Sequence, residues 1–437
     1  MTMAVSARSL TSGFAAVVGR ERVQDEAAVL ADAALDSCVP RWVVRPGSLA
    51  ELAAVVALAC DERLAVMPRG SGSALELGAP LSRLDVVLDL SGLDRVIDYE
   101  PDDLVVSVEA GVTLGALARR LADRRQFVAL DPPGGDTRTL GGIAATNAIG
   151  PLACRYGAMR DRLLGVRFVQ ADGVLTWGGA KVVKSVTGYD VPKLMIGALG
   201  TLGVLAELTL RLYPCPEHEA TVLVSFDMID DAQAFVVAVL DSPIQPNRLE
   251  ILNHGALTAL DRPAPAGVAV SIAGVEAAVV AQHAAVRALA QRMRARARAA
   301  SGGWWDRYDT AFARGSIHLR LGTLTSEVGR TIDVVERLFG TTTVVVGSAA
   351  TGTLHARVPA PASSRTIDEL RDAVARLRSE VVPLGGHVVV TRAPKRLREA
   401  IDPWGPVDPG ALALMQALKD EFDPHRVLNP GRFVGGL

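Results

Sequence analysis

This chain has few cysteines, and they lie far apart. Cys38, Cys60, Cys154 and Cys215 form no Cys-x-x-Cys pair. The usual cysteine spacing of an iron–sulfur cluster is therefore missing, and a disulfide framework is not expected. We expect four unpaired thiols, so any iron–sulfur chemistry would have to come from another chain.

The chain also lacks a strong net charge and long apolar runs. A net charge of −2 over 437 residues gives no electrostatic argument for nucleic-acid binding. No apolar run approaches the ~18 residues of a membrane span. The N-terminus lacks the basic, apolar and small-residue pattern of a signal peptide. We expect a cytoplasmic protein, held at the inner face of a membrane only through partners.

The composition is that of a globular protein. Hydrophobic residues make up 49% of the chain and charged residues 22%, which is not the balance of a disordered segment. The length is sufficient for two or three domains with their own cores.

Glycine is plentiful, and it gathers in two loops. The first is Pro68-Arg69-Gly70-Ser71-Gly72-Ser73-Ala74, directly after an expected strand at 65–68. The second, 131–150, combines a proline pair with two glycine pairs and has almost no charge after Thr139. Glycine lets the backbone approach a ligand, and N–H groups in such turns form anion-binding concavities. Either loop alone would fit an ordinary surface turn, but together they can hold a diphosphate from two sides.

Neither loop matches the common nucleotide-binding fingerprints. Leu75 stands where a Rossmann loop would have its third glycine, and no long parallel β-α-β context follows. The chain also has no Gly-x-x-x-x-Gly-Lys-Ser/Thr segment, which excludes a Walker-type site.

The hydrophobic pattern predicts a mixture of helices and strands. We expect a helical lead-in at 1–36, a β-hairpin formed by 163–170 and 174–177, and a strand at 202–212. Two prolines near Cys215 end this strand, and the pattern then restarts. The second part includes a long helix expected at 277–300.

Several further segments, together with the two loops, carry a resemblance to a known family. They are Arg155-Tyr156-Gly157 with Arg160-Asp161, the stretch 181–190 (Lys-Val-Val-Lys-Ser-Val-Thr-Gly-Tyr-Asp), Gly200–Val204, and Asn429-Pro430-Gly431-Arg432. In order and spacing over nearly the whole chain, they resemble the FAD-binding subunit of glycolate oxidase (glycolate dehydrogenase). That subunit belongs to the vanillyl-alcohol oxidase superfamily, with its PCMH-type FAD-binding domain.

The resemblance implies an α+β fold of two domains with FAD stretched between them. It implies a lead-in at 1–36, a PCMH-type FAD-binding domain at 37–215, and an α+β cap or substrate domain at 216–420. The last segment, 421–437, would return to the FAD-binding domain.

The resemblance also implies which residues hold the cofactor. Main-chain N–H groups of Arg69–Ser73 would hold the pyrophosphate from one side and residues 139–142 from the other, with Gly203–Val204 along the flavin or the adenine. Some members link FAD covalently through a His in the first loop, where this chain has Ser73, so we expect non-covalent FAD. The expected cofactor-binding residues are Pro68, Arg69, Gly70, Ser71, Gly72, Ser73, Pro133, Gly134, Thr139, Leu140, Gly141, Gly142, Thr146, Asn147, Arg155, Tyr156, Gly157, Lys184, Tyr189, Gly200, Gly203 and Val204.

The family's metal-binding segment is altered in this chain. Catalytic relatives use Gly-His-x-Gly-Asp-Gly-Asn-Leu-His, with a second His-bearing motif, to bind a metal and a 2-hydroxy acid. Here the segment is 347–355, with Ser348 for the leading His and Thr351 for the Asp. Ser and Thr alone cannot replace His and carboxylate ligands, so we expect no metal. The second motif keeps His387 but has Gly386 in place of the acid.

Removing hydride from a 2-hydroxy acid needs a base for the hydroxyl proton and a cation for the carboxylate. His387 is the candidate base and His355 could assist, although a His in a strand is also a common structural residue. Lys184, Tyr189 and Arg320 could supply charge or hydrogen bonds near the flavin.

The resemblance implies an FAD-dependent oxidoreductase acting on CH–OH donors. It would be one subunit of a complex that oxidises glycolate to glyoxylate and passes electrons through FAD to an iron–sulfur subunit. A catalytic FAD-linked subunit would lie beside it. Two alternatives remain open: a self-sufficient 2-hydroxy-acid dehydrogenase of the D-lactate type, and a flavin-carrying assembly subunit without turnover of its own.

Overall fold

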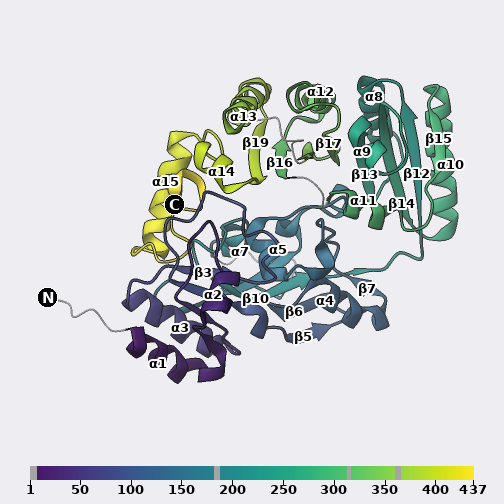
Figure 1. The fold of residues 1–437 in the computed structure, drawn as a ribbon. Coiled ribbons are helices and arrows are strands. Elements are labelled where there is room, and N and C mark those ends of the chain that lie inside the picture. Colours follow the sequence, from purple (N-terminus) through teal and green to yellow (C-terminus); the bar gives the residue numbers. More distant parts are fainter. Residues whose placement is uncertain (1–6, 182–187, 313–315, 360–365) are drawn as a thin grey trace.

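The computed structural model describes residues 7–181, 188–312, 316–359 and 366–437. Figure 1 shows two parts: the N-terminal segments form the lower part, and a large sheet with its helices forms the upper part. The C-terminal helix lies beside both. The fold is therefore a mixed α and β arrangement with the chain's last segment returning to its first half.

A small four-stranded sheet begins the lower part. Its strand order is β1-β2-β4-β3, with β1 antiparallel to β2 and the other pairs parallel. Its elements are α1 (Ala7–Val18), β1 (Val23–Gln24), α2 (Ala27–Asp32), β2 (Trp42–Val44), α3 (Leu49–Asp61), β3 (Val66–Arg69) and β4 (Val86–Asp89). The lead-in at 1–36 is thus not wholly helical. Val23 is 2% exposed and pairs with Val44, because burying its branched side chain in the sheet outweighs the helical tendency of the alanines around it.

An antiparallel five-stranded sheet follows, in the order β5-β6-β10-β8-β9. The hairpin expected from the sequence is confirmed as β8 paired with β9. The elements here are β5 (Val96–Glu100), β6 (Val105–Glu109), α4 (Leu114–Leu121), β7 (Gln126–Phe127), α5 (Leu140–Thr146), α6 (Ala153–Tyr156), β8 (Leu163–Val169), β9 (Leu175–Gly179), α7 (Val191–Met195), β10 (Val204–Arg211) and β11 (Tyr213–Pro214). Helices α4 and α5 share one core with β6, β8 and β10.

The upper part is an antiparallel eight-stranded sheet, in the order β15-β12-β14-β13-β17-β18-β16-β19. The strands are β12 (His218–Phe226), β13 (Arg248–Asn253), β14 (Ala266–Gly274), β15 (Arg296–Ala299), β16 (Ile317–Gly322), β17 (Val344–Ser348), β18 (Thr353–Val358) and β19 (His387–Arg392). The helices of this part are α8 (Ile229–Leu240), α9 (His254–Ala259), α10 (Glu276–Arg292), α11 (Trp304–Phe312), α12 (Val328–Phe339), α13 (Ile367–Val381) and α14 (Lys395–Ala400). The last helix, α15 (Pro409–Phe422), packs against the lower part, where Phe422 contacts Phe168.

The long helix expected at 277–300 ends earlier. Helix α10 stops at Arg292, Arg294 has a positive φ of 59°, and the chain continues as β15, paired with β12. Residues 294–299 alternate Arg and Ala, a period of two that fits a strand whose charged side chains face solvent.

The two faces of the large sheet differ in chemistry. Helices α8, α10, α12 and α13 cover one face with a continuous hydrophobic core. In Figure 1, α8, α12 and α13 lie at the top, on the side away from the lower part. Side chains of the opposite face, including Glu250, His355 and Arg357, therefore point toward the first two sheets, and this is where a site between the halves can form.

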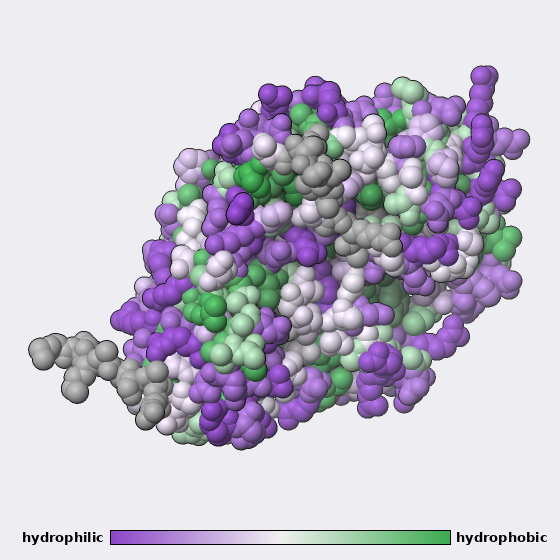
Figure 2. Space-filling view, in the orientation of Figure 1, coloured by the Kyte–Doolittle hydropathy of each residue, from purple (hydrophilic) through white to green (hydrophobic). Residues whose placement is uncertain are grey.

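No helix in the described ranges is both long and apolar enough to cross a membrane. Figure 2 shows one face of the molecule, with hydrophilic residues around most of its edge and hydrophobic residues in smaller patches between them.

Candidate functional site

The first glycine loop leaves the end of β3 with main-chain donors available. In the part of the chain that the structure describes, the N–H groups of residues 71–73 donate no hydrogen bond. Gly72 has a φ of 75°, a left-handed conformation that glycine adopts readily. A Cβ at Gly70 would lie 2.1 Å from Oγ1 of Thr139, so only glycine lets this loop touch the second loop. The loop has the character of an anion-binding concavity.

The second glycine stretch forms the start of a helix. Thr139 is the N-cap of α5, and its Oγ1 accepts a hydrogen bond from the N–H of Gly142 at 3.2 Å. Thr139, Gly142 and Thr146 line a cavity together with the first loop. The two loops therefore do meet, as the sequence predicts, but through one threonine and one turn of helix.

Two expected contacts of the second loop are corrected by its hydrogen bonds. The N–H of Leu140 donates to the carbonyl of Val112 at 2.8 Å, and that of Gly141 donates to the carbonyl of Ala110 at 2.9 Å. Leu140 is fully buried, and a Cβ on Gly141 would lie 2.7 Å from the Cβ of Ala110. These two residues anchor α5 to the core, so their N–H groups are not available to a diphosphate.

The C-terminal segment completes the cavity. Leu428 forms a parallel bridge with Val66 of β3, which places Asn429 and Arg432 beside the first loop. Arg432 donates from Nη2 to the carbonyl of Leu75, and to that of Leu77 at 2.5 Å. Burial lowers the pKa of Arg432 to about 10, so it remains a cation at neutral pH.

The residues around this cavity fit FAD. Its space is about 520 Å³ with the opening to solvent, and loop N–H groups, Thr146 and Arg432 line it. Nδ2 of Asn429 donates to the carbonyl of Leu199 at 2.6 Å, whereas its buried Oδ1 has no partner among the described residues. A buried acceptor without a partner is costly unless a ligand supplies a donor. The cavity lining includes residues absent from the expected set: Ala74, Leu75, Leu77, Ala145, Leu199, Asn429 and Arg432. The Asn-Pro-Gly-Arg segment was the sequence signal for the last two.

Other expected cofactor residues lie in different places. Pro133 and Gly134 line the larger cavity described below, which Thr146 also reaches from the first cavity, and the carbonyl of Asn147 accepts a hydrogen bond from Arg320 at its edge. The close approach expected at Gly203 is to the ring of Phe168, which a Cβ would meet at 2.6 Å. Val204 is fully buried in the core. The expectation that Gly203–Val204 lies along the cofactor is therefore corrected.

A third group lines a cavity that shares no lining residue with the first. Arg155, Tyr156, Gly157 and Tyr189 all contribute to it. Tyr189 is 95% exposed, so it has little contact with the rest of the protein. Lys184 lies outside the described residues. These expected positions are thus not brought to the cavity formed by the two loops.

A further cavity, called the larger cavity here because it exceeds the one at the two glycine loops, lies between those loops and the polar face of the eight-stranded sheet. Its space is about 1080 Å³ with the part open to solvent. From the lower part it is lined by Ser73, Ala74, Glu76, Leu77, Pro133, Gly134, Thr137, Arg138, Thr146, Ala148 and Ile149. From the sheet it is lined by His318, Arg320, His355, Arg357, Thr391 and Arg392. Four arginines and a single carboxylate, Glu76, give this cavity a strongly cationic lining.

The two histidines expected to act in catalysis are placed differently. His355 lies on β18 directly opposite Arg320 of β16, and it lines the cavity. Burial, followed by the positive charges of Arg357 and Arg320, lowers its pKa to about 3, so it is a neutral acceptor at pH 7. His387 starts β19 and is exposed, with its ring over Gly322. Partial desolvation of the ring against Gly322, followed by the charge of Arg320, lowers the pKa of His387 as well.

A protonated carboxyl lies beside the cavity. Glu250 of β13 and Tyr308 of α11 line a small adjoining pocket that also reaches His355 and Ser348. The O–H of Tyr308 donates to Oε2 of Glu250 at 2.5 Å, and burial raises the pKa of Glu250 to about 8. At neutral pH this carboxyl is mostly protonated, so it adds no negative charge to offset the arginines.

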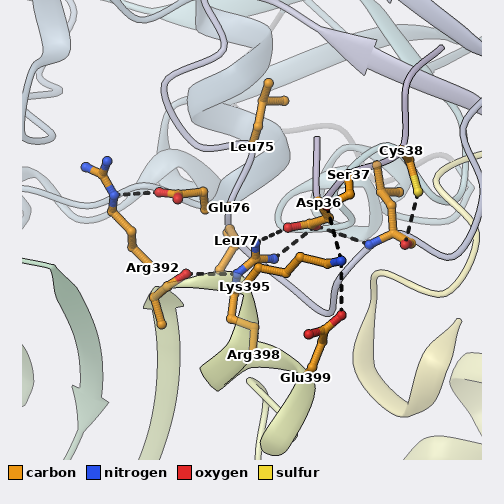
Figure 3. Close-up of polar contacts among 12 residues, drawn as sticks. Asp36, Ser37, Cys38, Leu75, Glu76, Leu77, Arg392, Lys395, Arg398 and Glu399 are labelled. Carbon is orange, nitrogen blue, oxygen red and sulfur yellow. Dashed lines mark hydrogen bonds and ion pairs between the residues drawn. The ribbon is translucent and has the colours of Figure 1, made fainter. Parts of the chain in front are cut away.

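A cluster of polar contacts joins the upper and lower parts at one side of this cavity (Figure 3). Arg398 of α14 makes an ion pair with Asp36, and each side chain is only 2% exposed. Arg392 pairs with Glu76 at 2.5 Å, and Lys395 reaches the hydroxyl of Ser37 at 3.4 Å. A buried ion pair persists only when it is well partnered, so Arg398–Asp36 fixes α14 against the segment around Asp36, while the exposed Arg392–Glu76 pair joins β19 to the residues after the first loop.

The altered metal segment forms the β17–β18 hairpin. Ser348 ends β17 and Thr351 lies in the exposed turn, while His355 points to the cavity. Within the described ranges, no three His, Cys, Asp or Glu side chains gather as a metal site would require.

Comparisons with known proteins agree with this arrangement. Residues 40–179 match the sequence profile of an FAD binding domain, and residues 215–270 and 265–433 match that of the C-terminal domain of FAD linked oxidases. A probable mitochondrial D-lactate dehydrogenase of Danio rerio is 27% identical, over 97% of this chain and 91% of the relative. The glycolate oxidase subunit GlcD of Bacillus subtilis is 25% identical, over 90% of this chain and 89% of the relative.

The fold has solved counterparts. The structure of p-cresol methylhydroxylase with substrate bound superposes with a TM-score of 0.80 at 15% identity, covering 97% of this chain and 96% of that one. The matches cover both parts of the chain and agree with the cavity at the two loops. The chain belongs to the FAD-linked oxidases, as an FAD-dependent oxidoreductase with a PCMH-type FAD-binding fold.

Proposed function

We propose that this chain oxidises a 2-hydroxy acid, using the larger cavity as its substrate site. The supporting observation is that Arg320 and His355 lie opposite each other on neighbouring strands and face the end of the FAD-binding loops. Arg320 would bind the substrate carboxylate, and His355 would accept the proton of its hydroxyl group. FAD, when bound, supplies the hydride acceptor.

Arg320 is well placed for this task. Its Nη1 donates to the carbonyl of Asn147 at 3.3 Å, which directs the guanidinium toward the loop after α5. Burial lowers its pKa, and no carboxylate in the described residues forms an ion pair with it. A bound carboxylate would supply the missing counter-charge and raise the pKa of the neighbouring His355, which would make that imidazole a better base.

The test is anaerobic reduction of the bound flavin. Adding glycolate or D-lactate to the purified protein should bleach the oxidised-flavin band at about 450 nm. Arg320→Met should lower kcat/KM roughly a hundredfold, because it removes a charge-assisted hydrogen bond. His355→Gln should lower kcat with little change in KM. His425→Gln, at an exposed position, is the matched control and should behave as the parent. Absence of bleaching by every 2-hydroxy acid tried would exclude the proposal.

We also propose that the FAD is non-covalent, since Ser73 occupies the position of a linking His. Acid precipitation should release the yellow colour into the supernatant. Colour that stays with the pellet would contradict the proposal.

The finer proposal places the chain in a glycolate-oxidising complex with a catalytic FAD-linked subunit and an iron–sulfur subunit. Its four cysteines are unpaired and dispersed, so electrons leaving the flavin need an acceptor elsewhere. Glycolate-dependent dye reduction should then require co-expressed partners. Ser348 and Thr351 stand where the family's metal-binding motif has a His and an Asp. This difference favours a second candidate function, a flavin-carrying subunit that does not itself turn over substrate. In that case the isolated chain would hold FAD and resist bleaching, while the complex would be active.

A further inference from the structure

The small pocket beside His355 adjoins the larger cavity. Its space is about 330 Å³ with the part open to solvent, and Ile149 and His355 line both the pocket and the larger cavity. Beyond His355, the polar side chains in its wall are those of Glu250, Tyr308 and Ser348, together with Thr353 at its rim. A group attached to a substrate in the larger cavity can therefore enter this pocket.

The pocket lies on the same face of the sheet as the residues proposed to bind the substrate. Strand β18 has β16 on one side and β17 on the other, and β13 follows β17. His355 of β18 lies opposite Arg320 of β16, and Ser348 of β17 lies opposite Glu250 of β13. Val346, two residues before Ser348, lies opposite His355 on the other side. Directly opposed residues share a face, so these side chains form a row across four strands.

Ser348 brings a buried hydroxyl group without a partner to the pocket. It is 5% exposed, and its Oγ forms no hydrogen bond in the part of the chain that the structure describes. Its main-chain carbonyl, by contrast, accepts a hydrogen bond from the N–H of Thr351 at 3.2 Å. A buried hydroxyl group without a partner is destabilising, so its presence indicates that a ligand or a bound water supplies one.

The other polar wall of the pocket is neutral at pH 7. Glu250 is 2% exposed, and its Oε2 accepts a hydrogen bond from the O–H of Tyr308 at 2.5 Å. Because burial raises its pKa to about 8, the carboxyl is mostly protonated and can both donate and accept a hydrogen bond. Among the described residues the lining includes no Lys or Arg, and Ile149, Pro151 and Val346 add apolar surface. These walls suit a hydroxyl group better than a second carboxylate.

We propose that this pocket binds a hydroxyl group on carbon 3 of the substrate, so that the substrate is a 2,3-dihydroxy acid of the glycerate type. This rests on the proposed function: the carboxylate binds at Arg320, the hydroxyl group on carbon 2 lies at His355, and the hydrogen on carbon 2 faces the flavin. The remaining substituent of carbon 2 then extends toward β17, where Ser348 and Glu250 bind its hydroxyl group. That hydroxyl group keeps its proton, and the oxidation takes place at carbon 2 alone.

The first test measures the binding of two acids that lack a hydroxyl group on carbon 2, by calorimetry on the FAD-loaded, oxidised protein. 3-Hydroxypropionate and butyrate have the same length and differ only in a terminal hydroxyl or methyl group. 3-Hydroxypropionate should bind at least about tenfold more tightly. Ser348→Ala should remove most of this preference and leave butyrate binding unchanged. It should not lower the unfolding temperature, because the hydroxyl group that it removes has no partner in the free protein. Ser326→Ala, at an exposed position, should keep the preference.

A second measurement separates this inference from the proposed function. Flavin bleaching by glycerate is compared with bleaching by 2-hydroxybutyrate, which has a methyl group in place of the second hydroxyl group. Glycerate should have a kcat/KM at least about tenfold higher, and Ser348→Ala should bring the two values together. Preferential binding of 3-hydroxypropionate without bleaching by any 2-hydroxy acid would keep the pocket and refute the oxidation. Bleaching by 2-hydroxy acids with equal binding of 3-hydroxypropionate and butyrate, or with binding of neither, would overturn the pocket's role and keep the oxidation.

Discussion

The two glycine-rich loops meet at Thr139 but present their backbones in different ways. The first loop leaves β3 without entering a helix, and the N–H groups of residues 71–73 remain available in the described structure. The second loop begins α5, and the N–H groups of Leu140 and Gly141 are bound to carbonyls of the core. A run of glycine can therefore serve ligand binding or close packing. The distinction depends on where each N–H group donates and on what a Cβ would touch.

The sharpest test of this comparison is Gly70→Ala. Its Cβ would lie 2.1 Å from Oγ1 of Thr139, whose side chain is only 3% exposed and has little room to move. We expect FAD binding to weaken by roughly a hundredfold, since overpacking of this kind costs up to about 3 kcal/mol. Because the loop is partly exposed and can shift away from Thr139, the unfolding free energy of the FAD-free protein should fall by less than the free energy of FAD binding. Gly302→Ala is the matched control, because its Cβ would meet nothing within 4 Å. Full flavin content in Gly70→Ala would show that the loop is wrongly assigned.

Gly141→Ala should have the opposite pattern. Its Cβ would lie 2.7 Å from the Cβ of Ala110 and 2.9 Å from its carbonyl oxygen, within the core. We expect a loss of about 1–3 kcal/mol in the free energy of unfolding, measured in urea on the FAD-free protein. Flavin content below the unfolding transition should stay close to that of the parent. Loss of FAD with unchanged stability would return Gly141 to the binding site.

Much of the fold follows from local patterns in the sequence. The β8–β9 hairpin and both glycine loops depend on residues within a few positions of each other, and each is where the sequence predicts it. The strand β15 was missed because a helical, alanine-rich context precedes it. The Arg–Ala alternation alone does not identify a strand, because these residues form one only by pairing with the edge of β12.

The cationic half of the site could not be derived in this way. Arg320, His355 and Arg357 become neighbours through the register of β16 against β18, and Arg138 joins them from the other part of the molecule. Such contacts depend on tertiary packing across more than two hundred residues of chain. The segment 347–355 resembles the family's metal-binding motif, so the sequence points to this strand as a source of metal ligands. In the structure, the neighbours of His355 are arginines instead.

A substitution at Arg432 tests what holds the first loop in the conformation that leaves its N–H groups available to a ligand. Its guanidinium donates to the carbonyls of Leu75 and Leu77, just after the loop, and is 4% exposed. Arg432→Met keeps much of the side-chain volume but removes these bonds. We expect FAD affinity to fall about tenfold, as the loss of a hydrogen bond from a charged group would cause. Arg426→Met removes an exposed arginine that pairs with Asp420, and its FAD affinity should match that of the parent. Equal affinities in the two variants would mean that the loop holds its shape without Arg432.

The smallest effect is expected at Thr139, the residue that both loops share. Its Oγ1 accepts from the N–H of Gly142 and so caps α5, while its methyl group packs against the first loop. Thr139→Val keeps the shape and removes the acceptor, which should cost about 1 kcal/mol of unfolding free energy. Thr139→Ser keeps the acceptor and removes the methyl group, so it should retain most of the stability and loosen FAD binding by no more than a fewfold. If both variants lose stability equally, the cap contributes nothing. If Thr139→Val alone loses FAD, the hydroxyl itself contacts the cofactor, and the second loop takes part in binding through a side chain as well as through its shape.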